Sequence, residues 1–320
     1  MRRLGKHAKR RMLIIVNPYA TTVSDRLKNL VVYALQGRYE VEAVDTKAQN
    51  HATEIGREVR DHGYDVVVAF GGDGTLNEVV NGLAGTDIPV SVLPGGSTNV
   101  VCRTLGIPND VVDATEHLLA LADEWAPRRI DLGAADERHF VFSCGMGIDA
   151  TVVRRVDSHP RLKARGGPYY YSWAAVSAFY RHYLRNAVKV RVQTVADETA
   201  EGVTALAQNS HPFTYFAKRP VRVCEGVEID DGTLSIAVLK RAAQRDMPTL
   251  IARLFGESGA AANHRQIEHF EDVAEATVAS ISKDKGGALR PFPVQVDGDY
   301  IGNRTRVELR AVPGALTVIS

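Results

Sequence analysis

The first 125 residues alternate between short apolar runs and segments with helical spacing. Met12–Val16 and Asp65–Phe70 are strand-sized runs of aliphatic and β-branched residues, whereas Ser24–Leu35 places its leucines and valines on one helical face. Strands that alternate with helices assemble into parallel sheets through βαβ units. The pattern therefore predicts an α/β domain with a parallel sheet over residues 1–127.

The sequence changes character at Pro127, after which short strand candidates are separated by turn residues. The candidates are Arg128–Leu132, His139–Ser143, Ala187–Thr194, Thr204–Ala207, Phe213–Ala217, Thr233–Leu239 and Val294–Val296. Two helical stretches, Tyr169–Leu184 and Met247–Phe255, interrupt them. This arrangement favours a larger, mostly antiparallel β domain over residues 128–320. We expect the last ~10 residues of that domain to return to the first domain.

Two glycine-bearing loops follow two successive strands of the first domain. Gly71–Thr75 follows Asp65–Phe70, and Pro94–Asn99 follows Val90–Leu93. The carboxyl ends of parallel strands meet at one crevice, and glycines let backbone amides approach a phosphate closely. Neither loop is a P-loop or a dinucleotide-binding fingerprint, and tight turns with no ligand remain the alternative. Asp73 inside the first loop favours a site where a carboxylate meets a cation.

Charge and hydropathy exclude several classes of protein. The formal net charge is +1, from 39 basic and 38 acidic residues, which argues against a dedicated nucleic-acid binder. The N-terminus is basic, but the apolar run that follows it is too short for a signal peptide or a membrane span. We therefore expect a cytoplasmic protein that contacts membranes transiently. The basic residues of Met1–Arg11 and the basic and aromatic segment Arg161–Trp173 are candidate membrane contacts, with a solubilising tail and core packing of Tyr169–Tyr183 as one helix as the respective alternatives.

Motifs in a fixed order along nearly the whole chain carry a family resemblance. They are Asn17-Pro18, Thr46, Gly71–Gly82, Pro94–Asn99, Cys102–Pro108, Ile130–Gly133, Gly145–Ala150, Ile229–Leu234 and Val296–Asp299. In these motifs the chain resembles the diacylglycerol kinase catalytic family, in its bacterial soluble lipid kinase branch, which is related in fold to NAD kinase. The resemblance implies an ATP- and Mg²⁺-dependent kinase that phosphorylates a lipid hydroxyl at a membrane surface, most simply diacylglycerol to phosphatidic acid.

The resemblance also implies a role for each matched position. ATP would be held by Asn17, Pro18, Thr46, Gly71, Gly72, Asp73, Gly74, Thr75, Leu76, Asn77, Glu78, Gly96 and Ser97. A structural Mg²⁺ would be held by Asp231 with the carbonyls of Glu228 and Thr233. Asp73 and Asp131 would join a water-linked acidic network near the catalytic magnesium. Asp297 or Asp299 would be the general base, although Asp297-Gly298 by itself is typical of a hairpin turn.

The sequence departs from the family pattern and leaves alternatives open. Val100 stands where many members have Asp, and Asp299 stands where they have Glu. The lipid could be diacylglycerol, a sphingoid base, ceramide or a glycerophospholipid. An NAD kinase and a nucleotide-binding regulator without catalysis are the other hypotheses, and a homodimer is compatible with the sequence. Asn77-Glu78 directly inside the first motif favours the lipid kinase over the NAD kinase.

Overall fold

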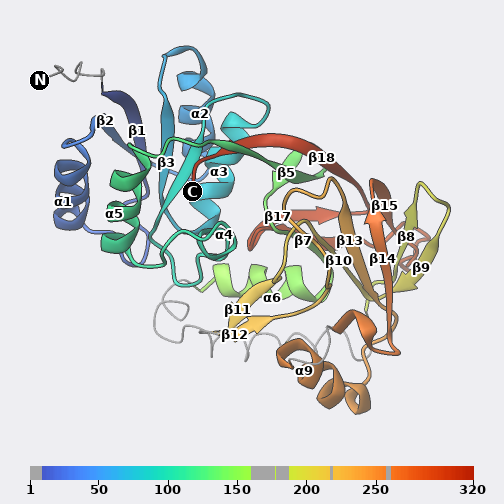
Figure 1. Cartoon of the computed structure of the whole chain (residues 1–320). Helices are drawn as coiled ribbons and strands as arrows, with labels where there is room; N and C mark the ends of the chain where they lie inside the picture. The colour runs from blue at the N-terminus through green and yellow to red at the C-terminus, as the bar shows by residue number, and fades with distance from the viewer. Residues whose placement is uncertain (1–8, 160–176, 178–186, 217–218, 257–260) are drawn as a thin grey trace, which may run out of the picture. The chain divides into compact units, whose positions relative to one another are not determined.

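The computed structural model describes residues 9–159, 177, 187–216, 219–256 and 261–320 (Figure 1). The chain divides into two compact units: unit 1 is Met1–Arg129 with Leu316–Ser320, and unit 2 is Ile130–Ala315. The candidate membrane segment Arg161–Trp173 lies outside the described residues, as do residues 1–8 and, except for Ser177, the predicted helix Tyr169–Leu184.

Unit 1 contains a parallel sheet in the order β2–β1–β3–β4. Its strands are β1 (Arg10–Val16), β2 (Tyr39–Asp45), β3 (Val66–Gly71) and β4 (Val90–Pro94). Every residue of β3 and β4 is buried, which is why both strands are continuous apolar runs in the sequence. Beyond β4, the end of β18 (Arg306–Val318) adds in parallel, with Val318 opposite Val90.

Helices cover both faces of this sheet (Figure 1). They are α1 (Asp25–Leu35), α2 (His51–Glu58, continued by the 3-10 turn Val59–Asp61), α3 (Asp73–Leu83), α4 (Val100–Thr104) and α5 (Val111–Leu121). Helices α1 and α5 pack together on one face, and α2 and α3 on the other. A Cβ atom on Gly82 would lie 2.8 Å from Cα of Gly56, so these two glycines allow α2 and α3 to touch through their backbones.

Unit 2 is a sandwich of two antiparallel sheets. One sheet runs β14 (Ile267–Val273), β13 (Leu234–Leu239), β10 (Thr204–Gln208), β7 (Ser143–Met146), β16 (Phe292–Val296) and β17 (Asp299–Arg304). The other runs β18, β15 (Glu275–Ser280), β8 (Val190–Thr194) and β9 (Thr199–Gly202), with β5 (Arg128–Ala135) and β6 (Arg138–Phe140) attached. A separate hairpin joins β11 (Thr214–Phe216) to β12 (Arg219–Val221).

The core of unit 2 lies between the inner faces of these sheets. Strand β8 alternates buried and exposed residues, and its buried Val190 and Val192 join a cluster with Ile236 and Val294 of the facing sheet. An α/β domain followed by a mostly antiparallel β domain is thus confirmed.

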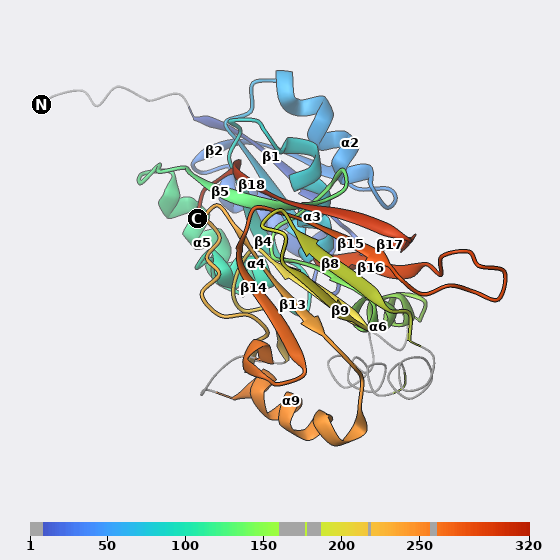
Figure 2. The same ribbon diagram turned by 90° about the vertical axis from the view of Figure 1, so that its right-hand side faces the viewer.

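Unit 2 also contains α-helices, of which one was predicted and one was not. The prediction of a helix over Met247–Phe255 is confirmed as α9, which extends from the ends of β13 and β14 in both views (Figures 1 and 2). Helix α6 (Ile148–Asp157) was not predicted, because a β strand and a glycine turn precede it without a recognisable cap. Within the described ranges, no helix is both long enough and apolar enough to cross a bilayer.

Candidate active site

The two glycine loops of unit 1 lie directly against each other. The amide of Gly95 donates to the carbonyl of Gly71 over 2.7 Å. A Cβ atom on Gly95 would lie 2.8 Å from Cα of Gly71, and one on Gly96 would lie 2.8 Å from Cα of Gly72. Real side chains do not approach a backbone this closely, so the glycines are required for the two loops to meet. Loops that were separate in the sequence therefore form one backbone surface at the ends of β3 and β4.

The N-terminus of α3 opens on this surface. Gly72 occupies the N-cap position and supplies no side-chain cap, while Asp73, Gly74 and Thr75 form the first turn. The amides at a helix N-terminus carry the positive end of the helix dipole and suit an anion. Asn17 donates from Nδ2 to Oγ1 of Thr75 over 2.9 Å, which fixes the hydroxyl at the mouth of the helix.

Asp73 joins the first loop to the start of α4. Its carboxylate accepts the amides of Val100 at 3.0 Å and Val101 at 3.3 Å, so it caps the N-terminus of that helix. Val100, at the position where the family often has Asp, is 1% exposed and packs into the core. The carboxylate of Asp73 is thus committed in part to holding the second loop, a role that sequence reasoning did not foresee.

The side chains of three predicted nucleotide residues are buried or bonded to the protein itself. Leu76 and Asn77 are 2% and 0% exposed. Glu78 accepts the amides of Asn50 at 2.8 Å and Ala52 at 3.1 Å, so its carboxylate caps the N-terminus of α2. These contacts support the first loop from behind, and the predicted role of the three residues in holding the nucleotide stays a prediction.

The remaining predicted nucleotide residues lie at the carboxyl ends of unit 1 strands. Pro18 follows Asn17 just after β1, and Thr46 follows β2, where its amide donates to the carbonyl of Val16 over 2.8 Å. Ser97 is exposed at the tip of the second loop. The parallel sheet therefore brings them to the edge that carries the glycine loops.

Asp131 of unit 2 is a buried junction between three segments. Its Oδ2 accepts the amide of Gly232 and its Oδ1 that of Gly314, both at 2.6 Å, and its own amide donates to Ile229. The side chain is 5% exposed. Two backbone amides therefore hold the Asp131 carboxylate, and its predicted place in a water-linked acidic network stays a prediction.

Asp231 organises an exposed loop. Its Oδ2 accepts the amide of Glu228 at 2.8 Å, and its Oδ1 accepts the amide and the hydroxyl of Thr233 at 2.9 and 3.1 Å. A carboxylate has about four acceptor positions, so one remains for a hard cation that prefers oxygen. The donor chemistry fits a magnesium ion. No group of three or more His, Cys, Asp or Glu side chains suited to a metal occurs among the described residues.

The corner between β16 and β17 separates the two candidate bases. Asp297 and Gly298 both have positive φ, 47° and 85°, as a two-residue hairpin turn with the strand twist requires. The Asp297 carboxylate is 3% exposed and accepts the amides of residues 141, 142 and 143 at 2.6, 2.9 and 3.1 Å. Asp299 begins β17 and is partly exposed. Asp297 therefore anchors the corner, and Asp299 is the more exposed of its two acids.

Asp149, in the first turn of α6, supports the same corner and was missed as a site residue. Its Oδ2 accepts Nε2 of Gln295 over 2.6 Å, and Oε1 of Gln295 accepts the amide of Gly298 over 2.7 Å. Burial raises the pKa of Asp149 to about 6, although the Gln295 hydrogen bond opposes the shift. A Cβ on Gly145 would lie 2.0 Å from this carboxylate, which explains a glycine there. The presence of Asp149 within the Gly145–Ala150 motif was the signal in the sequence that could have identified it.

Comparison with known proteins places both units in one family. Residues 11–134 match the model of the diacylglycerol kinase catalytic domain, and residues 143–320 match the YegS C-terminal NAD kinase beta sandwich-like domain. The chain belongs to the diacylglycerol kinase family. It is a lipid kinase of the bacterial branch that is related to NAD kinase.

Relatives of this family resemble the chain over nearly its whole length. A diacylglycerol kinase of Staphylococcus saprophyticus is 25% identical over 92% of this chain and 90% of its own. One of Staphylococcus aureus is 26% identical over 92% of this chain and 87% of its own. The crystal structure of a diacylglycerol kinase from Bacillus anthracis, 24% identical, has the same fold, with a TM-score of 0.72 over 98% of each chain.

Proposed function

We propose that this lipid kinase transfers the γ-phosphoryl group of ATP to the free hydroxyl of diacylglycerol and so makes phosphatidic acid. The observation that carries the nucleotide half is the N-terminus of α3, which has no side-chain cap and opens between glycines in backbone contact. The relatives named diacylglycerol kinase support the choice of acceptor.

The first loop cradles the triphosphate in this proposal. The amides of the first turn of α3 point at phosphate oxygens, and the Thr75 hydroxyl, held by Asn17, adds a donor. Phosphoryl transfer depends mainly on positioning and on neutralising charge, so aimed amides contribute directly to the rate. Ser97 at the tip of the second loop and Thr46 after β2 complete the nucleotide site.

Asp299 acts as the general base. As the hydroxyl oxygen of the lipid forms a bond to the γ-phosphorus, its proton passes to the Asp299 carboxylate and the bond to the ADP oxygen breaks. Asp299 is favoured over Asp297 because the Asp297 side chain is 3% exposed and already accepts three buried amides, whereas Asp299 is partly exposed. The hydrogen bonds through Gln295 hold the corner that presents Asp299.

Magnesium would accompany the nucleotide and neutralise the charge that develops on the transferred group. The exposed carboxylate of Asp231, with the carbonyls of Glu228 and Thr233, would hold a second, structural ion. The support for that site is chemical: oxygen ligands, one open acceptor position on the carboxylate, and a loop already closed by its own hydrogen bonds.

The test is a transfer assay with γ-labelled ATP, resolved by thin-layer chromatography. The acceptors are diacylglycerol, sphingosine, ceramide and a glycerophospholipid in mixed micelles, and free NAD in parallel. We expect label in phosphatidic acid. Label in NAD with none in lipid would make the protein an NAD kinase, and label in another lipid would change the acceptor. ATP binding without transfer to any acceptor would favour the regulator without catalysis.

A further inference from the structure

Helix α9 presents an apolar face to the outside of unit 2. The helix runs from Met247 to Phe255 in the excursion between β13 and β14, and Leu250 is its buried residue. Ile251 and Phe255, one turn apart, are 53% and 38% exposed. Large exposed apolar side chains on neighbouring turns of one helix form a patch that is costly to leave in water.

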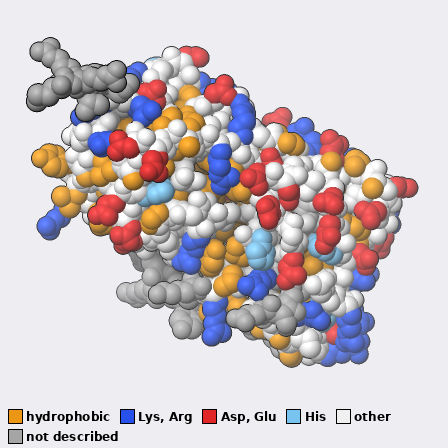
Figure 3. Space-filling view, in the orientation of Figure 1, with side chains coloured by type: hydrophobic (Ala, Val, Ile, Leu, Met, Phe, Trp, Pro, Cys, Tyr) orange, Lys and Arg blue, Asp and Glu red, His pale blue; other side chains and the backbone are white. Residues whose placement is uncertain are grey.

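Four arginines lie in α9 or close to it along the chain. Arg241 and Arg245 precede the helix, Arg253 lies in its last turn, and Arg265 follows it. The side chains of Arg241 and Arg265 are 52% and 67% exposed. Figure 3 shows Lys and Arg side chains gathered over the part of unit 2 where Figure 1 draws α9.

The acidic residue in this stretch of the chain is buried beneath the arginines. Asp246 is the acidic residue of the stretch 240–256, and its side chain is fully buried. It pairs with Arg265 at 2.5 Å and lies 4.0 Å from Arg241, and the hydrogen bond from Arg265 lowers its pKa. Among the described residues 240–256, the basic side chains at the surface therefore outnumber the acids, because Asp246 is buried.

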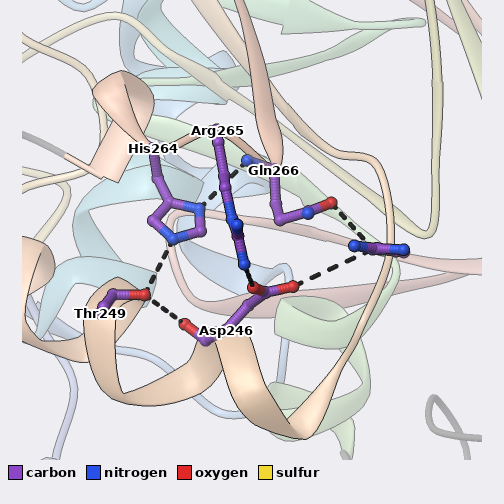
Figure 4. A network of polar contacts seen from close by, with 6 residues as sticks. Asp246, Thr249, His264, Arg265 and Gln266 are labelled. Carbon is purple, nitrogen blue, oxygen red and sulfur yellow. Dashed lines mark hydrogen bonds and ion pairs between the residues drawn. The ribbon is translucent and has the colours of Figure 1, made fainter.

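A polar network fixes the start of α9 to the segment that follows it (Figure 4). Nδ1 of His264 accepts the amide of Gln266, so in the neutral ring Nε2 carries the hydrogen toward Thr249 Oγ1, 2.9 Å away. Burial lowers the pKa of His264, which favours that neutral ring. The Thr249 hydroxyl donates to the carbonyl of Asp246 over 2.9 Å, and Arg265 closes the network on the Asp246 carboxylate. The apolar face thus sits on a rigid base.

We propose that α9 and its four arginines form a docking surface for a bilayer that contains anionic lipid. An interfacial helix places apolar side chains at the acyl boundary while arginines contact anionic headgroups, which matches the chemistry of this face. The inference rests on the proposed acceptor, a lipid that resides in a bilayer. The face displays Ile251 and Phe255 toward the bilayer, with the exposed Arg245 just before the helix, while Arg253 lies on another side of the helix within the same surface region.

The test measures co-sedimentation of the full-length protein with vesicles of phosphatidylcholine, with and without 30% phosphatidylglycerol (about one lipid in three, to give a marked surface charge). We compare I251S/F255S and R245S/R253S with a matched control, L30S/Y33S. Leu30 and Tyr33 are also exposed apolar residues one turn apart, but on α1 of unit 1.

We expect R245S/R253S to bind the anionic vesicles at least tenfold more weakly, because each arginine contributes about fivefold at such a surface. We expect a loss of about the same size for I251S/F255S, because its apolar side chains no longer enter the acyl boundary. The control variant should bind within twofold of the unmodified protein. Raising the salt concentration should weaken the binding of the unmodified protein and should affect R245S/R253S less.

Other results would overturn the inference. Unchanged binding by both α9 variants, or an equal loss in the α1 control, would remove α9 from the membrane contact. Conversion of a dimer to a monomer by I251S/F255S, measured by light scattering, would assign the face to a second copy of the chain. Transfer to a short-chain, dispersed diacylglycerol is measured separately: if it is absent in the unmodified protein, the proposed function fails while the vesicle result still stands.

Discussion

The two acids of the Asp297-Gly298-Asp299 corner should respond to mutation in opposite ways. Asp297 is buried and its carboxylate accepts three backbone amides, whereas Asp299 is partly exposed at the start of β17. Removal of the Asp297 carboxylate should therefore lower the stability of the fold, and removal of the Asp299 carboxylate should lower the rate of catalysis. The substitutions are D297A, D297N and D299N.

The loss of stability expected for D297A follows from the three backbone amides that lose their acceptor. A buried donor that loses its acceptor costs about 1–3 kcal/mol, and D297A affects three such donors. Costs within one network are not additive, so we expect about 4 kcal/mol in the free energy of unfolding. For a domain of this size, that lowers Tm by roughly 8–16 °C. D297N should cost less, because Asn keeps one acceptor and tolerates the positive φ.

Asp299 should behave as a general base. D299N should lower kcat by about 100-fold or more and leave Tm within about 2 °C. The assays are differential scanning fluorimetry and initial rates of phosphatidic acid formation, with D297N measured below its own melting transition. A D297N protein that melts normally yet has no activity, beside an active D299N, would refute the reasoning and make Asp297 the base.

Three further changes probe the remaining supports of the site. G95A should lower Tm and abolish ATP binding in calorimetry, since its Cβ would lie 2.8 Å from the Gly71 backbone, whereas G286A, which meets a side-chain atom at 3.4 Å, should be neutral. E78Q should lower stability by about 1 kcal/mol through the weakened α2 terminus but leave the Kd for ATP within about twofold. Burial raises the pKa of Asp149 in the folded protein from 3.8 to about 6. As the pH rises through that range, the free energy of unfolding of the unmodified protein should fall by about 2–3 kcal/mol relative to that of D149N. Urea unfolding at several pH values measures this difference.

Contrary outcomes are equally definite. Normal ATP binding by G95A would show that the loops tolerate separation, and a large rise in the Kd of E78Q would return Glu78 to the nucleotide site. For Asp149, the sign is fixed by the folded state holding the proton more tightly between pH 4 and 6. A stability difference from D149N that stays constant across that range would contradict a raised pKa.

Local patterns predicted most of the fold because they depend on neighbours in the chain. The buried strand β3 is a continuous β-branched run, and α9 begins and ends at the residues that its apolar spacing indicated. Helix α6 and strand β14 escaped prediction for the opposite reason. Strand β14, Ile267–Val273, carries acids and a histidine at positions that only pairing with β13 makes compatible with a sheet.

By itself, the sequence determined which loops carry glycine, where the strands that precede them end, and which acids belong to recurring motifs. Only the tertiary structure decided what each acid does, because its partners come from distant parts of the chain. Glu78 meets the start of α2, Asp131 meets Gly314, and Asp297 meets the amides of residues 141–143. A carboxylate that accepts several such amides is a structural support. Motif acids of the same type therefore become either anchors or candidate catalysts according to contacts that no local pattern encodes.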